Sequence, residues 1–493
     1  MELFFEGHTL RYAVEQMLLT LYPGERPVYP ERPDGALPCA RISLKEGTKY
    51  VTSVCRLETE HGVFHGRATV LRAAMTDAVL KKRLQSQAVK MALYRAALAS
   101  GLPKPVWGAL GGVRPAKLMA RLLDEGLSPQ AARTRFQTDY DVSPGKARLC
   151  LDAALAGRAA EDSLQPRDVC LYIGIPFCPT RCAYCSFVSS AVGKSAGLME
   201  PFLQALFQEI DATAAAVREC GLRPVALYVG GGTPTTLSAA QLDALCRHTA
   251  EAFDLSTLRE YTVEAGRPDT ITEEKLRVLQ SHGVDRLSVN PQTMRDDILQ
   301  AIGRRHTADD VERAMEAVSR VGGFTVNMDL IAGLPGDDAD GFAGTLERVM
   351  AFAPENITVH TLCLKKGARL MTEETKLPPA EAVGQMLEQT EAVLRGAQYA
   401  PYYLYRQKYM SGGFENVGWS KGNTQNLYNI CIMEELCTIL AMGGGASTKL
   451  TAPTGRIVRA FAPKYPQEYI ERIADTCAEK AKIKEFYDGK DGV

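Results

Sequence analysis

The sequence predicts an α/β protein with a partial (β/α)6 barrel of the TIM type, an N-terminal α+β domain and a C-terminal extension. From residue 169 to about 362, short apolar stretches alternate with stretches of helical periodicity. Such alternation gives right-handed βαβ units and a parallel sheet, and polar or glycine-rich residues follow the strands, where parallel barrels bind ligands. The pattern changes on either side, so we predict three domains: 1–165, 166–365 and 366–493.

Composition narrows the possible functions. The 57 Lys and Arg residues balance 58 Asp and Glu residues, so no broad basic surface predicts nucleic-acid binding. The first seven residues carry acidic side chains where a signal peptide carries basic ones, and no apolar run has the length of a membrane span. Thirteen scattered cysteines suit a reducing compartment. We expect a soluble, cytoplasmic protein without a membrane span or a nucleic-acid partner.

The N-terminal domain, whose role the sequence does not reveal, combines alternating apolar patterns with helical ones. We predict strands at 40–44 and 50–57, helices at 76–98, 116–123 and 144–156, and a linker at 157–165. Ser143 and Pro144 suit the cap and the first position of the last of these helices.

The central region supplies the barrel units. Its β-branched and apolar runs predict strands at 169–175, 225–229, 260–264, 286–290, 325–331 and 357–362. Apolar residues at helical spacing predict helices at 198–220, 239–253, 273–282, 308–321 and 341–352. In the extension we predict helices at 379–396 and near 467–480.

Three cysteines follow the first predicted strand. Pro176 ends that strand, so Cys178, Cys182 and Cys185 lie on the loop after it, with C-x3-C-x2-C spacing. Three thiolates can bind three irons of a cubane iron–sulfur cluster and leave the fourth iron open to a small molecule. A zinc site would need a fourth ligand, and no histidine is near. A disulfide set does not suit a chain without a signal peptide. We therefore predict a cluster.

Candidate ligand-binding residues follow the later strands. The run Gly230–Thr235 could approach a charged head group closely, or could be only a tight turn. Glu264 could accept hydrogen bonds from ribose hydroxyls, or could cap a helix or lie at the surface. Gln292 and Arg304 follow the fourth strand. Asp329 interrupts an apolar strand and needs a partner, for which a ribose or Arg304 would serve.

Together these motifs resemble the HemN-like radical S-adenosylmethionine proteins, which are the oxygen-independent coproporphyrinogen III oxidases (dehydrogenases) and their relatives. The matching pieces are Tyr172-x-x-Ile-Pro-Phe-Cys178, Gly230-Gly-Gly-Thr-Pro-Thr235, Arg286-Leu-Ser288, Gln292 and Asp329-Leu-Ile-x-Gly-Leu-Pro335. Pieces outside the barrel resemble the HemZ branch of that family, namely Leu110–Pro115, Glu415–Gly418 and Leu427–Asn429.

The resemblance implies a radical S-adenosylmethionine barrel with two cofactors, a [4Fe–4S] cluster and S-adenosylmethionine. The cluster ligands would be Cys178, Cys182 and Cys185. The residues lining the S-adenosylmethionine site would be Tyr172, Tyr184, Gly231, Gly232, Thr233, Glu264, Gln292, Arg304 and Asp329.

The resemblance also implies a reaction. An electron from the cluster would cleave S-adenosylmethionine, and the resulting deoxyadenosyl radical would take hydrogen from propionates of coproporphyrinogen III, giving protoporphyrinogen IX in haem biosynthesis. The partners would be the tetrapyrrole and an electron donor such as flavodoxin or ferredoxin. Basic side chains for the tetrapyrrole carboxylates, unless they form only a solvated surface, would come from Lys365, Lys366, Arg369, Arg406 and Lys408.

Two positions depart from the oxidase pattern. The well-studied oxidases have a fourth cysteine two residues after the third and a histidine four residues before the first, where this chain has Phe187 and Gly174. HemW-type haem chaperones share the first departure. A haem-binding or haem-transfer protein, and a radical enzyme acting on haem or another substrate, are therefore the alternatives to the oxidase.

Overall fold

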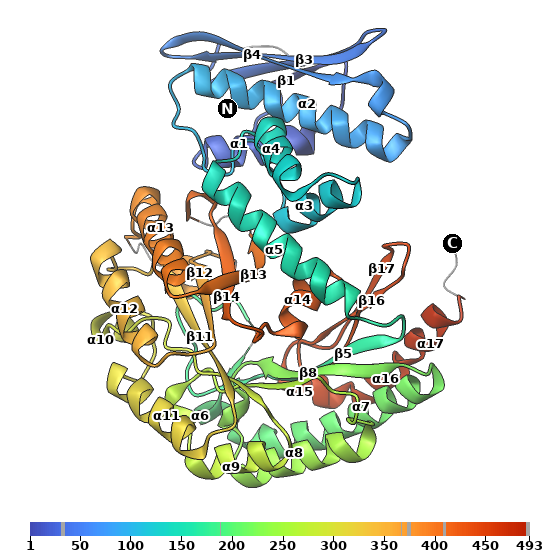
Figure 1. The fold of residues 1–493 in the computed structure, drawn as a ribbon, viewed down its shortest axis with the longest axis vertical. Coiled ribbons are helices and arrows are strands. Elements are labelled where there is room, and N and C mark those ends of the chain that lie inside the picture. Colours follow the sequence, from blue (N-terminus) through green and yellow to red (C-terminus); the bar gives the residue numbers. More distant parts are fainter. Residues whose placement is uncertain (31–34, 188, 366, 372–375, 408–410, 490–493) are drawn as a thin grey trace. The chain divides into compact units, whose positions relative to one another are not determined.

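The computed structural model describes residues 1–30, 35–187, 189–365, 367–371, 376–407 and 411–489 (Figure 1). The chain divides into two compact units, Met1–Leu151 with Gly412–Phe414 and Asp152–Ser411 with Glu415–Val493. The division falls inside helix α5 (Pro144–Asp162), which continues through most of the region predicted as a linker. A glycine inside a helix costs only about 1 kcal/mol, so Gly157 does not end it.

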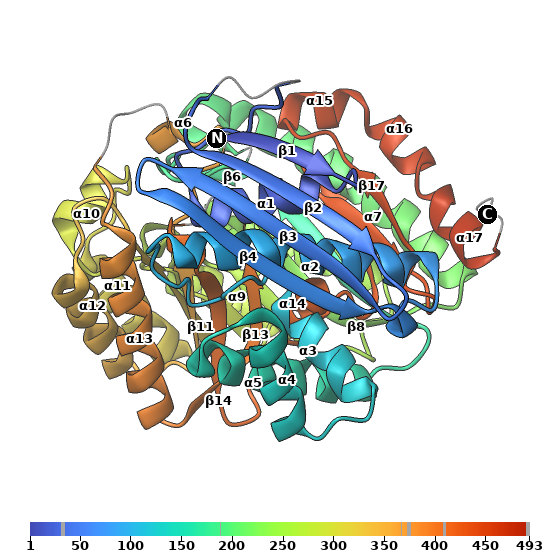
Figure 2. The ribbon, with the colours of Figure 1, turned by 90° about the horizontal axis from the view of Figure 1, so that it is seen from above.

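The first unit contains a four-stranded sheet in the order β1-β2-β3-β4 (Figure 2). Strand β1 runs parallel to β2, and the other pairs are antiparallel. Helix α2 packs along one face of the sheet, and buried residues of α1 and α2 form a core with the strands. The strands are β1 (Glu2–Glu6), β2 (Cys39–Glu46), β3 (Tyr50–Thr59) and β4 (Gly62–Leu71), and the helices are α1 (Arg11–Leu21), α2 (Ala78–Ala99), α3 (Pro115–Asp124) and α4 (Pro129–Tyr140).

This unit confirms most of the predicted elements. The strands predicted at 40–44 and 50–57 are β2 and β3, and the helix predicted at 76–98 is α2. Strands β1 and β4 and helices α1 and α4 were not predicted. A five-residue strand such as β1 and a helix with a partly buried apolar face such as α1 give weak local signals.

The second unit is built on one sheet of eleven strands, in the order β13-β14-β12-β11-β10-β9-β8-β5-β15-β16-β17. Its six central strands are parallel and confirm the predicted barrel strands. They are β5 (Asp168–Ile175), β8 (Arg223–Gly231), β9 (Glu260–Glu264), β10 (Arg286–Ser288), β11 (Thr325–Ala332) and β12 (Asn356–Thr361). Strands β5 and β12 are not paired with each other, so these six strands form a partial barrel.

Helices cover the outer side of this sheet (Figure 1). Several begin at a side chain that accepts a hydrogen bond from the first turn: Ser238, Thr272, Thr307 and Asp338. Such caps accept hydrogen bonds from the first backbone N–H groups of a helix, which have no partner within the helix itself. They explain why the predicted starts of these helices were correct to within two residues. These helices are α7 (Met199–Glu219), α8 (Ala239–Ala252), α9 (Glu273–Ser281), α10 (Asp296–Ala301), α11 (Ala308–Val321) and α12 (Ala339–Ala351).

The C-terminal extension adds strands to both edges of the partial barrel. Strand β14 pairs antiparallel with β12 and with β13, and β15 pairs parallel with β5. The predicted helix near 467–480 is replaced by short helices, and β15–β17 were not predicted. The elements are α13 (Ala380–Gly396), β13 (Tyr399–Arg406), β14 (Glu415–Lys421), α14 (Leu427–Glu434), β15 (Thr438–Gly443), β16 (Ser447–Thr451), β17 (Ile457–Phe461), α15 (Pro466–Glu471), α16 (Ile473–Ala478) and α17 (Ala481–Tyr487).

Helix α14 packs into the core of the partial barrel. Residues of α14 share a buried cluster with Cys170 of β5, Tyr228 of β8 and tyrosines of β13. The Glu260 carboxylate accepts hydrogen bonds from the backbone N–H groups of Leu427 and Tyr428, each at 2.7 Å, and so satisfies the helix N-terminus. Among the described helices, none has the length and apolar character needed to cross a lipid bilayer.

Candidate functional site

The predicted site residues gather at the carboxyl ends of the parallel strands. Strands β5 and β8 are in register, so that Tyr172 pairs with Tyr228 and Gly174 with Gly230. The Tyr172 hydroxyl lies close to Gly231, since a Cβ on that glycine would be 3.1 Å away. Glu264 ends the neighbouring strand β9, and Asp329 lies on β11. The structure therefore brings together residues that are far apart in the sequence.

The loop with the three cysteines is held by buried contacts. Arg267, which is 2% exposed, donates hydrogen bonds to the carbonyl and hydroxyl oxygens of Thr180, at 3.3 and 3.1 Å. The Ala183 N–H donates to the Ile302 carbonyl at 2.8 Å. The Thr233 hydroxyl donates to the Cys178 Sγ at 3.5 Å, which joins the cysteine loop to the glycine-rich loop.

Arg304 connects the cysteine loop to the strand ends. It is 8% exposed and donates to the carbonyl of Asn290 at 2.7 Å, to the carbonyl of Gly266 at 3.2 Å and to the hydroxyl of Tyr184 at 3.0 Å. It also interacts with the Cys182 side chain. Arg304 thus anchors the cysteine loop to the backbone at the ends of the strands.

The glycine-rich loop approaches its neighbours too closely for side chains. A Cβ on Gly232 would lie 2.5 Å from the Phe177 carbonyl oxygen and 2.7 Å from that of Ile175. Gly231 has a φ of +102°, a conformation that favours glycine. The Gly232 N–H donates to the Ile175 carbonyl at 2.8 Å. These contacts place the loop directly beside the segment that leads into the cysteines.

Three tyrosine rings lie next to this loop. Tyr172 stacks with Tyr228 and with Tyr428 of α14, and Tyr228 and Tyr428 stack with ring centroids 4.5 Å apart. The Tyr228 hydroxyl donates to the Glu264 carboxylate at 2.6 Å. Burial raises the pKa of Glu264 to about 7, although the hydrogen bond from Tyr228 acts to lower it. Glu264 therefore changes charge near neutral pH.

Asp329 has partners from its own sheet. Asn327 donates to its carboxylate at 2.7 Å, and the His360 Nε2 lies 3.6 Å from it. Burial acts to raise the pKa of Asp329, but His360 and Asn327 overcome this effect and hold it below its usual value. Arg304 was expected as one possible partner of Asp329, but it donates its hydrogen bonds to Tyr184 and to the backbone carbonyls of Gly266 and Asn290.

Gln292 lies beside Asp329 in a strained backbone conformation. It has a φ of +69°, and it is 6% exposed. Its N–H donates to the Asp329 carbonyl at 2.9 Å, and its carbonyl accepts from the Ile331 N–H at 3.0 Å. Strained residues of this kind persist where the surroundings fix them, and they cluster at functional sites.

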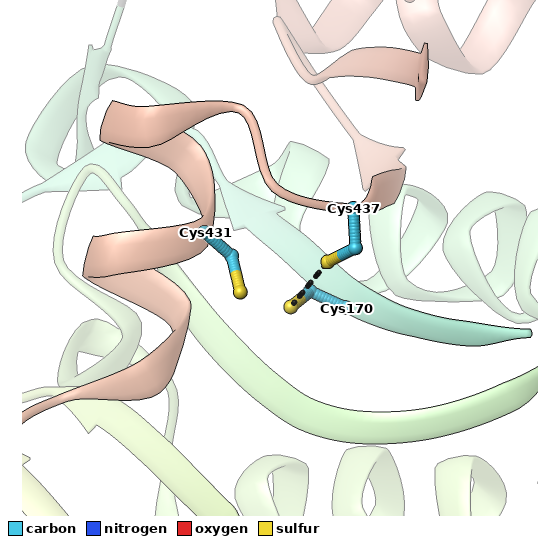
Figure 3. A group of neighbouring side chains, drawn as sticks. All are labelled: Cys170, Cys431 and Cys437. Atoms are coloured by element: carbon cyan, nitrogen blue, oxygen red, sulfur yellow. Dashed lines mark hydrogen bonds between the residues drawn. The ribbon is translucent and has the colours of Figure 1, made fainter. Parts of the chain in front are cut away.

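The motif cysteines fit a cluster better than a single metal ion. All three are partly exposed. Among the described residues, the three metal-ligand side chains that lie within 4.8 Å of one another are instead Cys170, Cys431 and Cys437, which are buried (Figure 3). A cubane does not require such closeness, because each thiolate binds a different iron. Sulfur-only donors suit an iron–sulfur cluster.

Sequence reasoning missed several residues of this site. Tyr228 could have been found, because it precedes Gly230 by two residues as Tyr172 precedes Gly174. Tyr428 lies in a piece that resembles the HemZ branch but was not assigned to the site, and His360 and Arg267 gave no local signal. Of the predicted basic residues, Lys366 and Lys408 lie outside the described residues, while Arg406 is 8% exposed.

Comparisons with known proteins agree with this geometry. Residues 172–349 match the Radical SAM superfamily. The chain is 41% identical over 387 residues to the oxygen-independent coproporphyrinogen-III oxidase-like protein HemZ of Bacillus subtilis, covering 77% of each chain. It is 29% identical to the heme chaperone HemW of Haemophilus influenzae, covering 61% of this chain and 75% of that one.

The fold also has a solved counterpart. The chain matches the structure of coproporphyrinogen III oxidase HemN from Escherichia coli with a TM-score of 0.51 and 22% identity, over 66% of this chain and 73% of that one. Radical SAM proteins use a [4Fe–4S] cluster and S-adenosylmethionine, the two cofactors predicted from the sequence. The chain belongs to the HemN-like family of radical S-adenosylmethionine enzymes, the family of HemN, HemZ and HemW.

Proposed function

We propose that this enzyme converts propionate side chains of coproporphyrinogen III to vinyl groups and so produces protoporphyrinogen IX without oxygen. The observation that carries the proposal is the 41% identity to HemZ, since the match spans 387 residues and thus extends well beyond the Radical SAM region at 172–349. In each conversion the propionate would lose its carboxyl carbon as carbon dioxide. One hydrogen atom would pass to the deoxyadenosyl group released from S-adenosylmethionine, and one electron would pass to an external electron acceptor.

The cofactors would be held by the residues at the strand ends. Cys178, Cys182 and Cys185 would bind the [4Fe–4S] cluster, which when bound supplies the electron for cleavage of S-adenosylmethionine. The donor set supports this assignment, because three partly exposed thiols lie on a loop fixed by Arg267 and Arg304.

S-adenosylmethionine would lie along the loops that follow β5, β8, β9 and β11. Gly231 and Gly232 lie beside the segment that leads into the cysteines, and their lack of side chains would let an amino acid head group approach the backbone there. Glu264 and Asp329 would accept hydrogen bonds from the ribose hydroxyls. The remaining predicted contacts are Tyr172, Tyr184, Thr233, Gln292 and Arg304.

The test is an anaerobic assay with reconstituted cluster, reductant, S-adenosylmethionine and coproporphyrinogen III. Deoxyadenosine and tetrapyrrole products are followed by mass spectrometry. We expect protoporphyrinogen together with deoxyadenosine, and neither product from Cys182→Ala. Cys220→Ala, at the end of α7 and outside the predicted site, is the matched control and should keep both products. Deoxyadenosine without any decarboxylated tetrapyrrole would reject the proposed substrate.

A second function is favoured by one specific observation. Phe187 occupies the position of the fourth cysteine of the oxidases, and it is 67% exposed. The similarity to HemW supports a haem-binding or haem-transfer protein as the alternative. A haem titration followed by visible absorbance separates the two: stoichiometric, tight haem binding without protoporphyrinogen formation would favour the haem-transfer function.

A further inference from the structure

Three cysteines converge in the buried core of the partial barrel, apart from the C-x3-C-x2-C loop. Cys170 lies on β5, Cys431 on α14, and Cys437 directly before β15. We refer to them as the core triad. Their sulfur atoms lie within 4.8 Å of one another, and the Sγ atoms of Cys170 and Cys437 are 3.6 Å apart. Figure 3 shows the three side chains turned toward one another.

From this geometry we propose that the core triad is a three-thiolate binding site for one soft metal ion, copper(I). Three sulfurs arranged around one ion with bonds of about 2.3 Å would be about 4.0 Å apart. The Cys170–Cys437 separation of 3.6 Å is a little below that value, and the other two separations are no more than 4.8 Å. Small side-chain rotations would therefore place all three sulfurs at bonding distance.

The donor atoms select the type of metal. Within the described residues, the group contains thiols and no histidine, aspartate or glutamate. Hard ions such as Mg²⁺ and Ca²⁺ require oxygen ligands, and zinc prefers a fourth ligand. Thiolates select soft ions, among which copper(I) needs no fourth ligand. Cys170 and Cys431 are 0% exposed and Cys437 is 8% exposed. The surrounding apolar residues would therefore exclude water from the ion.

The core triad is distinct from the proposed cluster site. Ile175 lies five positions after Cys170 along an extended strand, a distance of about 16 Å, and the motif cysteines follow beyond Ile175. The two sites can therefore be tested separately. Because Cys170 and Cys431 are far apart in the sequence, a bound ion would also cross-link β5 to the C-terminal extension and stabilise the unit against unfolding.

The test uses the full chain with Cys178, Cys182 and Cys185 replaced by alanine, so that the cluster motif binds no metal. Under anaerobic conditions the protein competes for copper(I) with the chelator bicinchoninate. We expect one copper(I) ion per chain, with sulfur as the only ligand type in its X-ray absorption spectrum. Cys437→Ser in this background should weaken binding on the order of 100-fold or more, since loss of even an outer partner costs 10- to 100-fold.

Two comparisons keep the test decisive. Cys246→Ser is the matched control, because Cys246 is a buried cysteine of the same unit outside the triad, and copper binding should be unchanged. Thermal unfolding of the protein with an intact triad should shift to higher temperature with copper(I), a measurement that needs no triad substitution. Equal binding by the Cys437→Ser variant, or no thermal shift with copper(I), would overturn the proposal.

Discussion

At Gly232, an added methyl group has no room. Its Cβ would lie 2.5 and 2.7 Å from two carbonyl oxygens of the segment that leads into the cysteine loop. We expect Gly232→Ala to displace the glycine-rich loop and to weaken S-adenosylmethionine binding by about tenfold or more, because small misplacements at a site are costly. Equilibrium dialysis with labelled S-adenosylmethionine measures this.

The control for that substitution is Gly344→Ala in helix α12. A Cβ there meets no atom within 4 Å, and alanine stabilises a helix interior by about 0.5–1 kcal/mol relative to glycine. Binding should therefore remain unchanged in Gly344→Ala. If Gly232→Ala binds S-adenosylmethionine as tightly as the control does, the glycine-rich loop is a structural turn only.

Glu264 gives the protein a pH-dependent stability. Burial raises the pKa of Glu264 from its ordinary value of 4.5 in an unfolded chain to about 7 in the folded protein. The folded state therefore holds the proton more tightly, so the stabilising contribution is present below pH 4.5 and is lost as the pH rises through about 7. We expect the melting temperature to fall over this range more steeply in the wild-type chain than in Glu264→Gln. Parallel curves for the two proteins would contradict this account.

At the scale of elements, the first turn of α14 is capped by the Glu260 carboxylate together with the Asn426 side chain. Glu260 is 5% exposed and accepts two backbone hydrogen bonds from the first turn of that helix. Glu260→Ala leaves buried N–H groups unsatisfied, and hydrogen bonds to charged groups contribute about 1.5–3 kcal/mol. We expect a loss of about 3 kcal/mol in the stability of this unit, measured by urea unfolding. The control is Glu274→Ala at an exposed position of α9, which should change the stability of the unit little.

The sequence predicted the elements whose signal is local. Each of the six central strands carries its own apolar run, and helices such as α8 and α11 begin at a capping residue. Strands β15 to β17 were missed because β15 pairs with β5, a segment far away in the sequence, and because the run Gly443–Gly445 at the end of β15 indicates a loop. Likewise, Tyr428 lies beside Tyr228 only because α14 packs against the strands, and no local sequence pattern predicts that packing.

The predictable part of the candidate site consists of the residues that lie in sequence motifs. Cysteines, glycines and acidic residues that follow strands were predicted by their position, and the structure places them at one edge of the sheet. The partner of Asp329 was not predicted, since His360 lies on the neighbouring strand β12 and approaches only after the strands pair. Arg267, which fixes the cysteine loop, also acts through tertiary contacts.

At the scale of the whole molecule, the chain consists of two units with separate cores. We expect calorimetry to resolve two unfolding transitions, since each unit buries its own apolar cluster. All predicted cofactor contacts belong to the second unit, so S-adenosylmethionine at about 100 times its Kd should stabilise one transition by about 2.7 kcal/mol and leave the other unchanged. A shift of both transitions would contradict this assignment.

The central claim is that the motif cysteines, rather than the core triad, hold the iron–sulfur cluster. The most direct measurement is the iron content and electron paramagnetic resonance spectrum of the anaerobically reconstituted and reduced protein, with and without S-adenosylmethionine. We predict about four irons per chain and a spectrum that changes when S-adenosylmethionine is added. Both should be lost in Cys182→Ala and retained in Cys170→Ser. Iron retained in Cys182→Ala and lost in Cys170→Ser would contradict the account.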